Sequence, residues 1–163
     1  MKAALSFTEL LHYTESEYRH WREWFEKNPA ALEVKTDIAD TTNVLQLVLH
    51  IVAVDLRYAQ RLLNEEVTSY EKIPTSTEGL FDTTQTALEK MRAFIAKASE
   101  EEWEKIITFS TMTAGTLSAS KRKCLIHSLL HGARHWAQLA TILRAAGYKQ
   151  DWPHDFLFSD AMS

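Results

Sequence analysis

The sequence predicts an all-α fold, organised as a four-helix bundle. Only four glycines and three prolines occur among the 163 residues. Because these turn-forming residues are rare, long stretches run without interruption, which favours helices over a many-stranded β fold. In four of these stretches apolar residues recur at helical spacing. The hydrophobic share of 45% is typical of a globular protein, so we expect one domain over residues 1–163 with one sizeable core.

The first helix is expected over about residues 6–27. Ser6 and Glu9 have the spacing of a capping box, in which each side chain accepts a hydrogen bond from the other residue's backbone N–H group. Pro29 follows the expected end and cannot continue a helix. The stripe that we expect in the core consists of Leu10, Leu11, Tyr18, Trp21, Trp24 and Phe25.

The second helix is expected over about residues 41–63, with Asp40 or Thr41 as its N-cap. This segment is apolar almost all round, which is typical of a helix that is buried on most sides. A buried strand is the alternative, because the segment is rich in β-branched residues. Its length favours the helix.

A connection of 13 residues, 64–76, follows this helix. Fully extended, it reaches about 43 Å, whereas a helix of 22 residues is about 33 Å long. The connection can therefore carry the chain back to the starting end, so that the second and third helices run parallel. An up-down-up-down order would not need such a long connection.

The third helix is expected over about residues 77–98. Ser99 and Glu102 have the pattern of a second capping box, which predicts one short helical turn. The threonine-rich segment 106–116 that comes next fits either a short hairpin or an extended loop.

The last helix is expected over about residues 120–146, where Gly147 is a suitable C-terminal stop. The tail, residues 148–163, contains several large apolar side chains. Such a tail is expected to pack either on the bundle or on a second subunit.

The charge balance argues against nucleic acid as a partner. The formal net charge is −4, whereas a nucleic-acid-binding surface needs a basic stripe. We interpret the basic run at residues 121–123 and the acidic run at 100–102 as solvated helix starts and loops.

The remaining composition predicts a soluble cytoplasmic protein. Cys124 is the only cysteine, so no internal disulfide can form. The first residues lack the apolar core of a signal peptide, and no apolar run approaches the length of a membrane span.

Three histidines form the main candidate site. His131 and His135 are four residues apart, so they share one face of the last helix. They lie near the middle of that helix, and His50 lies near the middle of the second helix. If the two helices pack together in either relative direction, the three imidazoles can meet at one depth.

Three neutral imidazoles with an open fourth position are a ligand set that catalytic zinc sites use, and imidazole also suits nickel, iron and copper. The alternative is that each histidine is a hydrogen-bonded core residue. Three buried rings without a shared partner would leave several polar groups unsatisfied, at about 1–3 kcal/mol each. We therefore predict a divalent metal ion on His50, His131 and His135, with an open position for water or substrate.

Two further polar residues are expected beside the metal ligands. His127 continues the row of histidines, but the row drifts by about 40° per step, so all three rings cannot aim equally at one ion. We assign His127 to the pocket or to the surroundings of the ligands. Gln138 lies one turn beyond His135 and can hold a ligand ring by a hydrogen bond.

The stretch 126–147 resembles the last helix of the DinB/YfiT superfamily. It contains a histidine, a glycine directly after it, a second histidine four residues on, a glutamine and a Leu-Arg-x-x-Gly ending. The second helix and the tail segment 152–157 are also similar to those of the family. In the second helix the resemblance rests on Leu49, His50, Ile51, Asp55, Arg57 and Tyr58.

The resemblance implies a four-helix bundle in the order up-down-down-up, with a long crossover between helices 2 and 3. It also implies a divalent metal, commonly zinc or nickel, on His50, His131 and His135, and it implies a homodimer. Some family members transfer groups to low-molecular-weight thiols. Arg134, Trp136 and Ala137 differ from the usual motif; these positions flank the site and bear on the substrate more than on the metal.

We therefore expect a metal-dependent enzyme that activates a thiol or a water for attack on a small electrophile. The first case is a thiol S-transferase and the second a hydrolase. No glutamate accompanies the histidine pair as a general base, which favours a thiol. The alternative function is a non-catalytic metal-binding bundle that acts in a stress response as a dimer.

Overall fold

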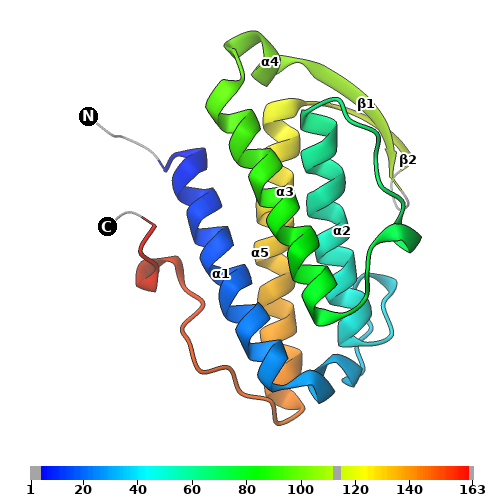
Figure 1. Ribbon diagram of the computed structural model, residues 1–163, viewed down its shortest axis with the longest axis vertical. Coiled ribbons are helices and arrows are strands. Elements are labelled where there is room, and N and C mark those ends of the chain that lie inside the picture. The colour runs from blue at the N-terminus through cyan, green and yellow to red at the C-terminus, as the bar shows by residue number, and fades with distance from the viewer. Residues whose placement is uncertain (1–4, 112–114, 162–163) are drawn as a thin grey trace.

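The computed structural model describes residues 5–111 and 115–161, and four long helices dominate it (Figure 1). The helices lie side by side with their axes roughly aligned. Their bounds are Phe7–Lys27 for α1, Val44–Leu62 for α2, Thr77–Lys97 for α3 and Lys121–Ala145 for α5. All four segments that the periodicity predicted are therefore helical, and the strand alternative for the second one is wrong.

The shorter elements lie at the ends and along two sides of the bundle of helices (Figure 1). Between α3 and α5 the chain forms a helix of five residues and two strands: α4 (Glu100–Glu104), β1 (Ile106–Thr111) and β2 (Gly115–Ser120). Four short 3-10 helices complete the described elements: Pro29–Glu33, Ile38–Asp40, Tyr70–Lys72 and Phe156–Phe158.

The two strands correct the prediction of an all-α fold. They pair antiparallel, with Ile106 opposite Ser120 and Thr111 opposite Gly115. The hairpin alternative is thus confirmed on either side of residues 112–114, which lie outside the described residues. Alternating half-burial along β1 shows why the sheet forms, because one face of this strand packs on the helices while the other faces solvent.

The start of α2 also differs from the prediction. Its N-cap is Asn43, whose side chain accepts a hydrogen bond from the backbone N–H of Gln46. Ala39 and Asp40 have φ angles of 53° and 59°, so the backbone turns through the left-handed region just before the helix. The predicted caps, Asp40 and Thr41, therefore belong to a turn rather than to the helix.

The connection between α2 and α3 runs back along the molecule beside α2 (Figure 1). Glu65, just after the end of α2, forms an ion pair with Lys90 in the second half of α3, with Nζ and Oε2 2.7 Å apart. The C-terminal ends of α2 and α3 therefore lie toward the same end of the molecule. Residues 64–76 carry the chain from the end of α2 back to the start of α3, as the length of this connection predicted.

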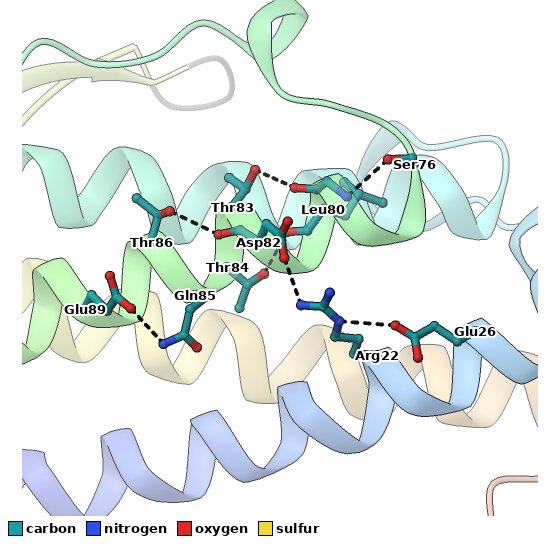
Figure 2. Close-up of polar contacts among 11 residues, drawn as sticks. Arg22, Glu26, Ser76, Leu80, Asp82, Thr83, Thr84, Gln85, Thr86 and Glu89 are labelled. Atoms are coloured by element: carbon teal, nitrogen blue, oxygen red, sulfur yellow. Dashed lines mark hydrogen bonds and ion pairs between the residues drawn. The ribbon is translucent and has the colours of Figure 1, made fainter.

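Polar contacts join the end of α1 to the start of α3, so these two helices run antiparallel (Figure 2). Arg22, late in α1, contacts Asp82, early in α3, at 2.9 Å, and it also contacts Glu26 on its own helix at 3.2 Å. Ser76 caps α3 by accepting a hydrogen bond from the N–H of Gly79. This exposed network orients α3 on α1, but exposed ion pairs stabilise a fold by only about 0–1 kcal/mol each.

The charged runs around α4 are not simply solvated, contrary to the prediction. The Lys121 side chain is fully buried, and its Nζ lies 2.5 Å from Oε2 of Glu102 and over the ring of Phe94. Arg122 pairs with Glu104 at 3.1 Å. These contacts join the short helix α4 to the start of α5, because a buried ammonium group needs a charged partner.

The tail packs on α1 through a buried carboxylate. Glu17 accepts a hydrogen bond from Nε1 of Trp152 at 3.1 Å and contacts Nδ1 of His154 at 2.9 Å. The rings of Trp152 and His154 pack against Trp21, which is fully buried. Of the two predicted partners for the tail, the bundle is therefore confirmed for this part. In the described residues, no helix combines the length and apolarity that a membrane crossing requires.

A buried polar network ties α1, α2 and α5 together. Asp55 of α2 accepts a hydrogen bond from the hydroxyl of Tyr18 and a second one, of 2.6 Å, from Ser128 Oγ. Burial raises the pKa of Asp55 to about 6. The three elements approach closely here, since a Cβ at Gly132 would lie only 3.3 Å from the Tyr18 hydroxyl oxygen.

The raised pKa of Asp55 predicts that stability falls as pH rises from about 4 to about 6. The folded state keeps the Asp55 proton in this window, whereas the unfolded chain has released it, so the loss is about 3 kcal/mol in total. Asp55→Asn should remove this component of the pH dependence. The measurement is urea unfolding of both proteins between pH 4 and pH 8. Asp151→Asn, on the exposed tail, serves as the control and should keep the wild-type slope; an unchanged slope in Asp55→Asn would contradict the assignment.

Candidate metal centre

The structure brings together the three histidines that the sequence singled out. His131 and His135 are buried on α5, and His50 is half-buried on α2. The Nε2 atoms of His50 and His131 are 3.0 Å apart. One ring nitrogen from each of the three residues lies within 4.8 Å of the others.

Antiparallel packing of α2 on α5 produces this convergence. Asp55 contacts Ser128, and His50, earlier in α2, contacts His131, later in α5. Each step toward the end of α2 is thus a step toward the start of α5. Both contacts lie near the middle of the two helices. The histidines of α2 and α5 therefore meet at the same depth in the bundle.

The nitrogen positions are close to those that a tetrahedral metal site needs. Zinc–nitrogen bonds of about 2.0–2.1 Å place two ligand nitrogens about 3.3 Å apart. The His50–His131 separation of 3.0 Å is near this value, and the largest separation in the group, at most 4.8 Å, has to shrink by up to about 1.5 Å. A rotation of one imidazole ring about its side-chain bonds can provide such a shift.

The three rings are held in the neutral form that binds metals. Burial, together with His135 and His50, lowers the pKa of His131 to about 3. Burial and His50 lower the pKa of His135 to about 4, and burial followed by Arg134 lowers the pKa of His50. The Nε2 atoms of His50 and His131, 3.0 Å apart, share a hydrogen bond when one ring carries its proton on Nε2. When both rings carry the proton on Nδ1, both lone pairs face a common point, and this donor set fits a divalent cation.

Gln138 lies where the sequence analysis expected it, next to the ring of His135. Its Oε1 accepts a hydrogen bond of 2.8 Å from Nδ1 of His135. With its hydrogen on Nδ1, the His135 ring has its free lone pair on Nε2. This Nε2 atom lies 3.2 Å from Nη2 of Arg134. By contrast, Nδ1 of His131 is buried and has no hydrogen-bond partner among the described residues.

His127 lies beside the cluster but outside the converging group. Its ring centroid is 5.6 Å from that of His131 and 5.2 Å from that of Tyr58. The residue is exposed, and burial of part of its ring, followed by Arg134, lowers its pKa. This position is consistent with the expected pocket role. The remaining histidines lie away from this cluster, on α1 and in the tail: His12, His20 and His154.

Two features near the site were missed by reasoning from sequence. The first is the hydrogen-bond network of Asp55, for which a carboxylate inside an apolar helix was the available signal. The second is a pair of arginines, Arg57 and Arg61, spaced one turn apart on α2. A cavity of about 420 Å³ between α1, α3 and the tail contains none of the three histidines, so the site is not part of that cavity.

Comparisons with known proteins agree with this architecture. The DinB family model matches residues 1–160. The fold is similar to the crystal structure of a DinB-like protein, YjoA, from Bacillus subtilis, with a TM-score of 0.61 and 18% sequence identity. That match covers 90% of this chain and 97% of the other chain. No curated protein matches the sequence.

The family match extends over nearly the whole chain and includes both helices that carry the histidines. The structural similarity, at 18% identity, supports the fold alone. The chain belongs to the DinB family.

Proposed function

We propose that this protein is a divalent-metal-dependent enzyme that activates a thiol or a water for attack on a small electrophile. His50, His131 and His135 are the proposed ligands, and zinc or nickel is the proposed metal. The observation that carries this proposal is the approach of neutral imidazoles from two helices, with the Nε2 atoms of His50 and His131 3.0 Å apart. A divalent cation on such a site lowers the pKa of a thiol or water at its open position and so provides a nucleophile near neutral pH.

The surrounding residues have positioning roles in this proposal. The amide of Gln138 fixes the His135 ring by its 2.8 Å hydrogen bond. Arg134, exposed beside the same ring, has to move its guanidinium group away from Nε2 to admit the ion. On the exposed side, His127 borders the position that a substrate would use.

A thiol is favoured over water as the nucleophile. In many metal-dependent hydrolases a carboxylate general base orients the attacking water and accepts its proton, whereas a metal-bound thiol ionises without one. Among the described residues, the group of converging ligand atoms consists of histidines only. Asp55, the buried carboxylate on the same helix as His50, is already bonded to Tyr18 and Ser128. We therefore propose a thiol S-transferase before a hydrolase.

The proposal includes the wider organisation of the chain. We infer one domain over residues 1–163 in the up-down-down-up order, which the Glu65–Lys90 and Arg22–Asp82 contacts support. We also propose a cytoplasmic homodimer.

The alternative is a non-catalytic metal-binding bundle that acts as a dimer in a stress response. It is favoured by the apolar side chains of the tail that remain uncovered, since Leu157 is 84% exposed and Phe158 is 64% exposed. Aromatic and aliphatic side chains of this kind are common anchors of interfaces.

The ligand assignment predicts the effect of four histidine substitutions. His50→Ala, His131→Ala and His135→Ala should each abolish stoichiometric binding of zinc or nickel, because two nitrogens alone hold these ions weakly. His127→Ala, a matched change on the same helix, should keep it. The measurement is metal content after dialysis of untagged protein, with circular dichroism as the folding check. Full metal content in any of the first three variants would exclude that residue as a ligand.

The role of Gln138 predicts a smaller effect. Loss of the hydrogen bond to His135 in Gln138→Ala should weaken metal binding by about ten-fold or more, without abolishing it. Competition with a chromogenic chelator measures the affinity. Gln85→Ala removes an exposed glutamine that bonds only to Glu89 on α3 (Figure 2) and is the control, with an affinity within about two-fold of wild type. Equal affinities in the two variants would contradict the role.

Turnover distinguishes the proposed enzyme from the alternative. The metal-loaded protein should conjugate a low-molecular-weight thiol to 1-chloro-2,4-dinitrobenzene faster than the same protein stripped of metal. Hydrolysis of p-nitrophenyl acetate in the absence of thiol tests the hydrolase version. Tight metal binding without turnover in either assay would refute the enzyme and favour the metal-binding dimer.

A further inference from the structure

Two arginines lie on the same stripe of α2 as His50. Arg57 and Arg61 are seven and eleven residues further along the helix, which places them within about 20° of His50 around the axis. Along the axis they are about 10 Å and about 16 Å beyond it. The stripe thus leads from the three histidines toward the C-terminal end of α2.

Both guanidinium groups are stacked on aromatic rings. Arg57 Cζ lies 5.1 Å from the centroid of Tyr70, in the connection between α2 and α3. Arg61 Cζ lies 5.2 Å from the centroid of Tyr58 and 4.6 Å from that of Phe109 on β1. A cation–π contact with a ring holds a guanidinium group in place and uses none of its N–H groups as hydrogen-bond donors to oxygen.

The edges of these two groups have almost no acceptors within the described part of the chain. Arg61 forms no ion pair or hydrogen bond there, and Arg57 forms only a long one, of 3.4 Å, to the carbonyl of Thr68. Glu71 is exposed and lies beyond ion-pair distance of Arg57, although Arg57 contributes slightly, after hydrogen bonds with the backbone and Ser69, to the lowered pKa of Glu71. Arg22, Arg92 and Arg122 have carboxylate partners. Arg19 and Arg134 have side-chain hydrogen-bond partners instead.

A pair of half-buried cations without a carboxylate at ion-pair distance is unfavourable for the protein alone. Burial, followed by repulsion from Arg57, lowers the pKa of Arg61. The chain has 22 acidic residues and a net charge of −4, so a shortage of carboxylates does not explain why these arginines lack ion-pair partners. Such an arrangement is expected where an anionic ligand supplies the missing charge.

A continuous row of rings joins the arginines to the histidines. The ring centroids of His131 and His127 are 5.6 Å apart, those of His127 and Tyr58 are 5.2 Å apart, and Arg61 lies on Tyr58. The arginines and the histidines are therefore connected through packed rings between α2 and α5.

We propose that Arg57 and Arg61 form a subsite for a compact oxyanion, a carboxylate or a phosphate, at the far end of the substrate whose reactive end meets the three histidines. This inference deepens the proposed function and rests on it for the identity of the reacting end. Because the positions of Arg57 and Arg61 lie about 10 Å and about 16 Å from that of His50 along the axis of α2, the subsite fits an elongated substrate. The bidentate geometry of guanidinium groups matches both anions.

Small anions can test the subsite without any metal. We would titrate succinate and, separately, glycerol 3-phosphate into the ¹⁵N-labelled full chain without added metal, with uncharged succinamide as the control compound. The Nε–Hε resonances of Arg57 and Arg61 should shift saturably with at least one anion and not with succinamide. The two titrations distinguish a carboxylate from a phosphate. No saturable shift at these arginines with either anion would overturn the proposal.

Variants then separate the subsite from general charge. Arg57→Gln/Arg61→Gln should weaken binding of the anion by about ten-fold or more, whereas Arg144→Gln/Lys149→Gln, which removes two exposed charges elsewhere, should stay within about two-fold. Arg57→Lys/Arg61→Lys is the second test if the glutamine variant does not fold, because it keeps both charges. It should bind the anion several-fold more weakly than wild type. Equal weakening by both neutralising pairs, or wild-type affinity in the lysine variant, would overturn the subsite. Because no metal is used, loss of the metal proposal would leave these results unaffected.

Discussion

The antiparallel contact between α2 and α5 is the constraint on which the other features depend. It brings a half-buried imidazole from one helix to within 3.0 Å of a buried imidazole from the other. At this distance one ring can donate a hydrogen bond from Nε2 to the other, or both rings can carry their proton on Nδ1 and direct two lone pairs at a common point. In the second tautomer the fold holds together a group of donors that fits a cation. The hydrogen bonds of Asp55 to Tyr18 and Ser128 keep the two helices, and α1, in this register.

The α2–α3 connection and the β1–β2 hairpin position two arginines of α2. Each of these segments contributes an aromatic ring, Tyr70 or Phe109, that stacks on an arginine of α2. They thereby hold two cations along the side of the bundle next to the histidines. Glu17 has a corresponding role for the tail on α1, where it binds Trp152 and His154. Segments outside the long helices are thus attached through specific polar and aromatic contacts.

The sequence was sufficient to predict the four long helices and the meeting of the three histidines. Both depend on spacing within a helix, which is fixed by backbone geometry. The position of Gln138 was predictable for the same reason. Features that depend on contacts between distant segments were not: the burial of Lys121 requires α4 to fold over the start of α5, and the start of α2 depends on the left-handed turn at Ala39 and Asp40. The aromatic surroundings of Arg57 and Arg61 likewise appear only when the connection and β1 are in place.

X-ray absorption spectroscopy of the untagged, zinc-loaded protein tests the central claim most directly. With one equivalent of zinc, we expect three imidazole nitrogens at about 2.0–2.1 Å and one exchangeable oxygen ligand. Addition of a low-molecular-weight thiol should replace that exchangeable ligand with sulfur at about 2.3 Å. A first shell with fewer than three imidazoles, or one that already contains sulfur from Cys124, would contradict the claim that these helices meet in order to hold a metal.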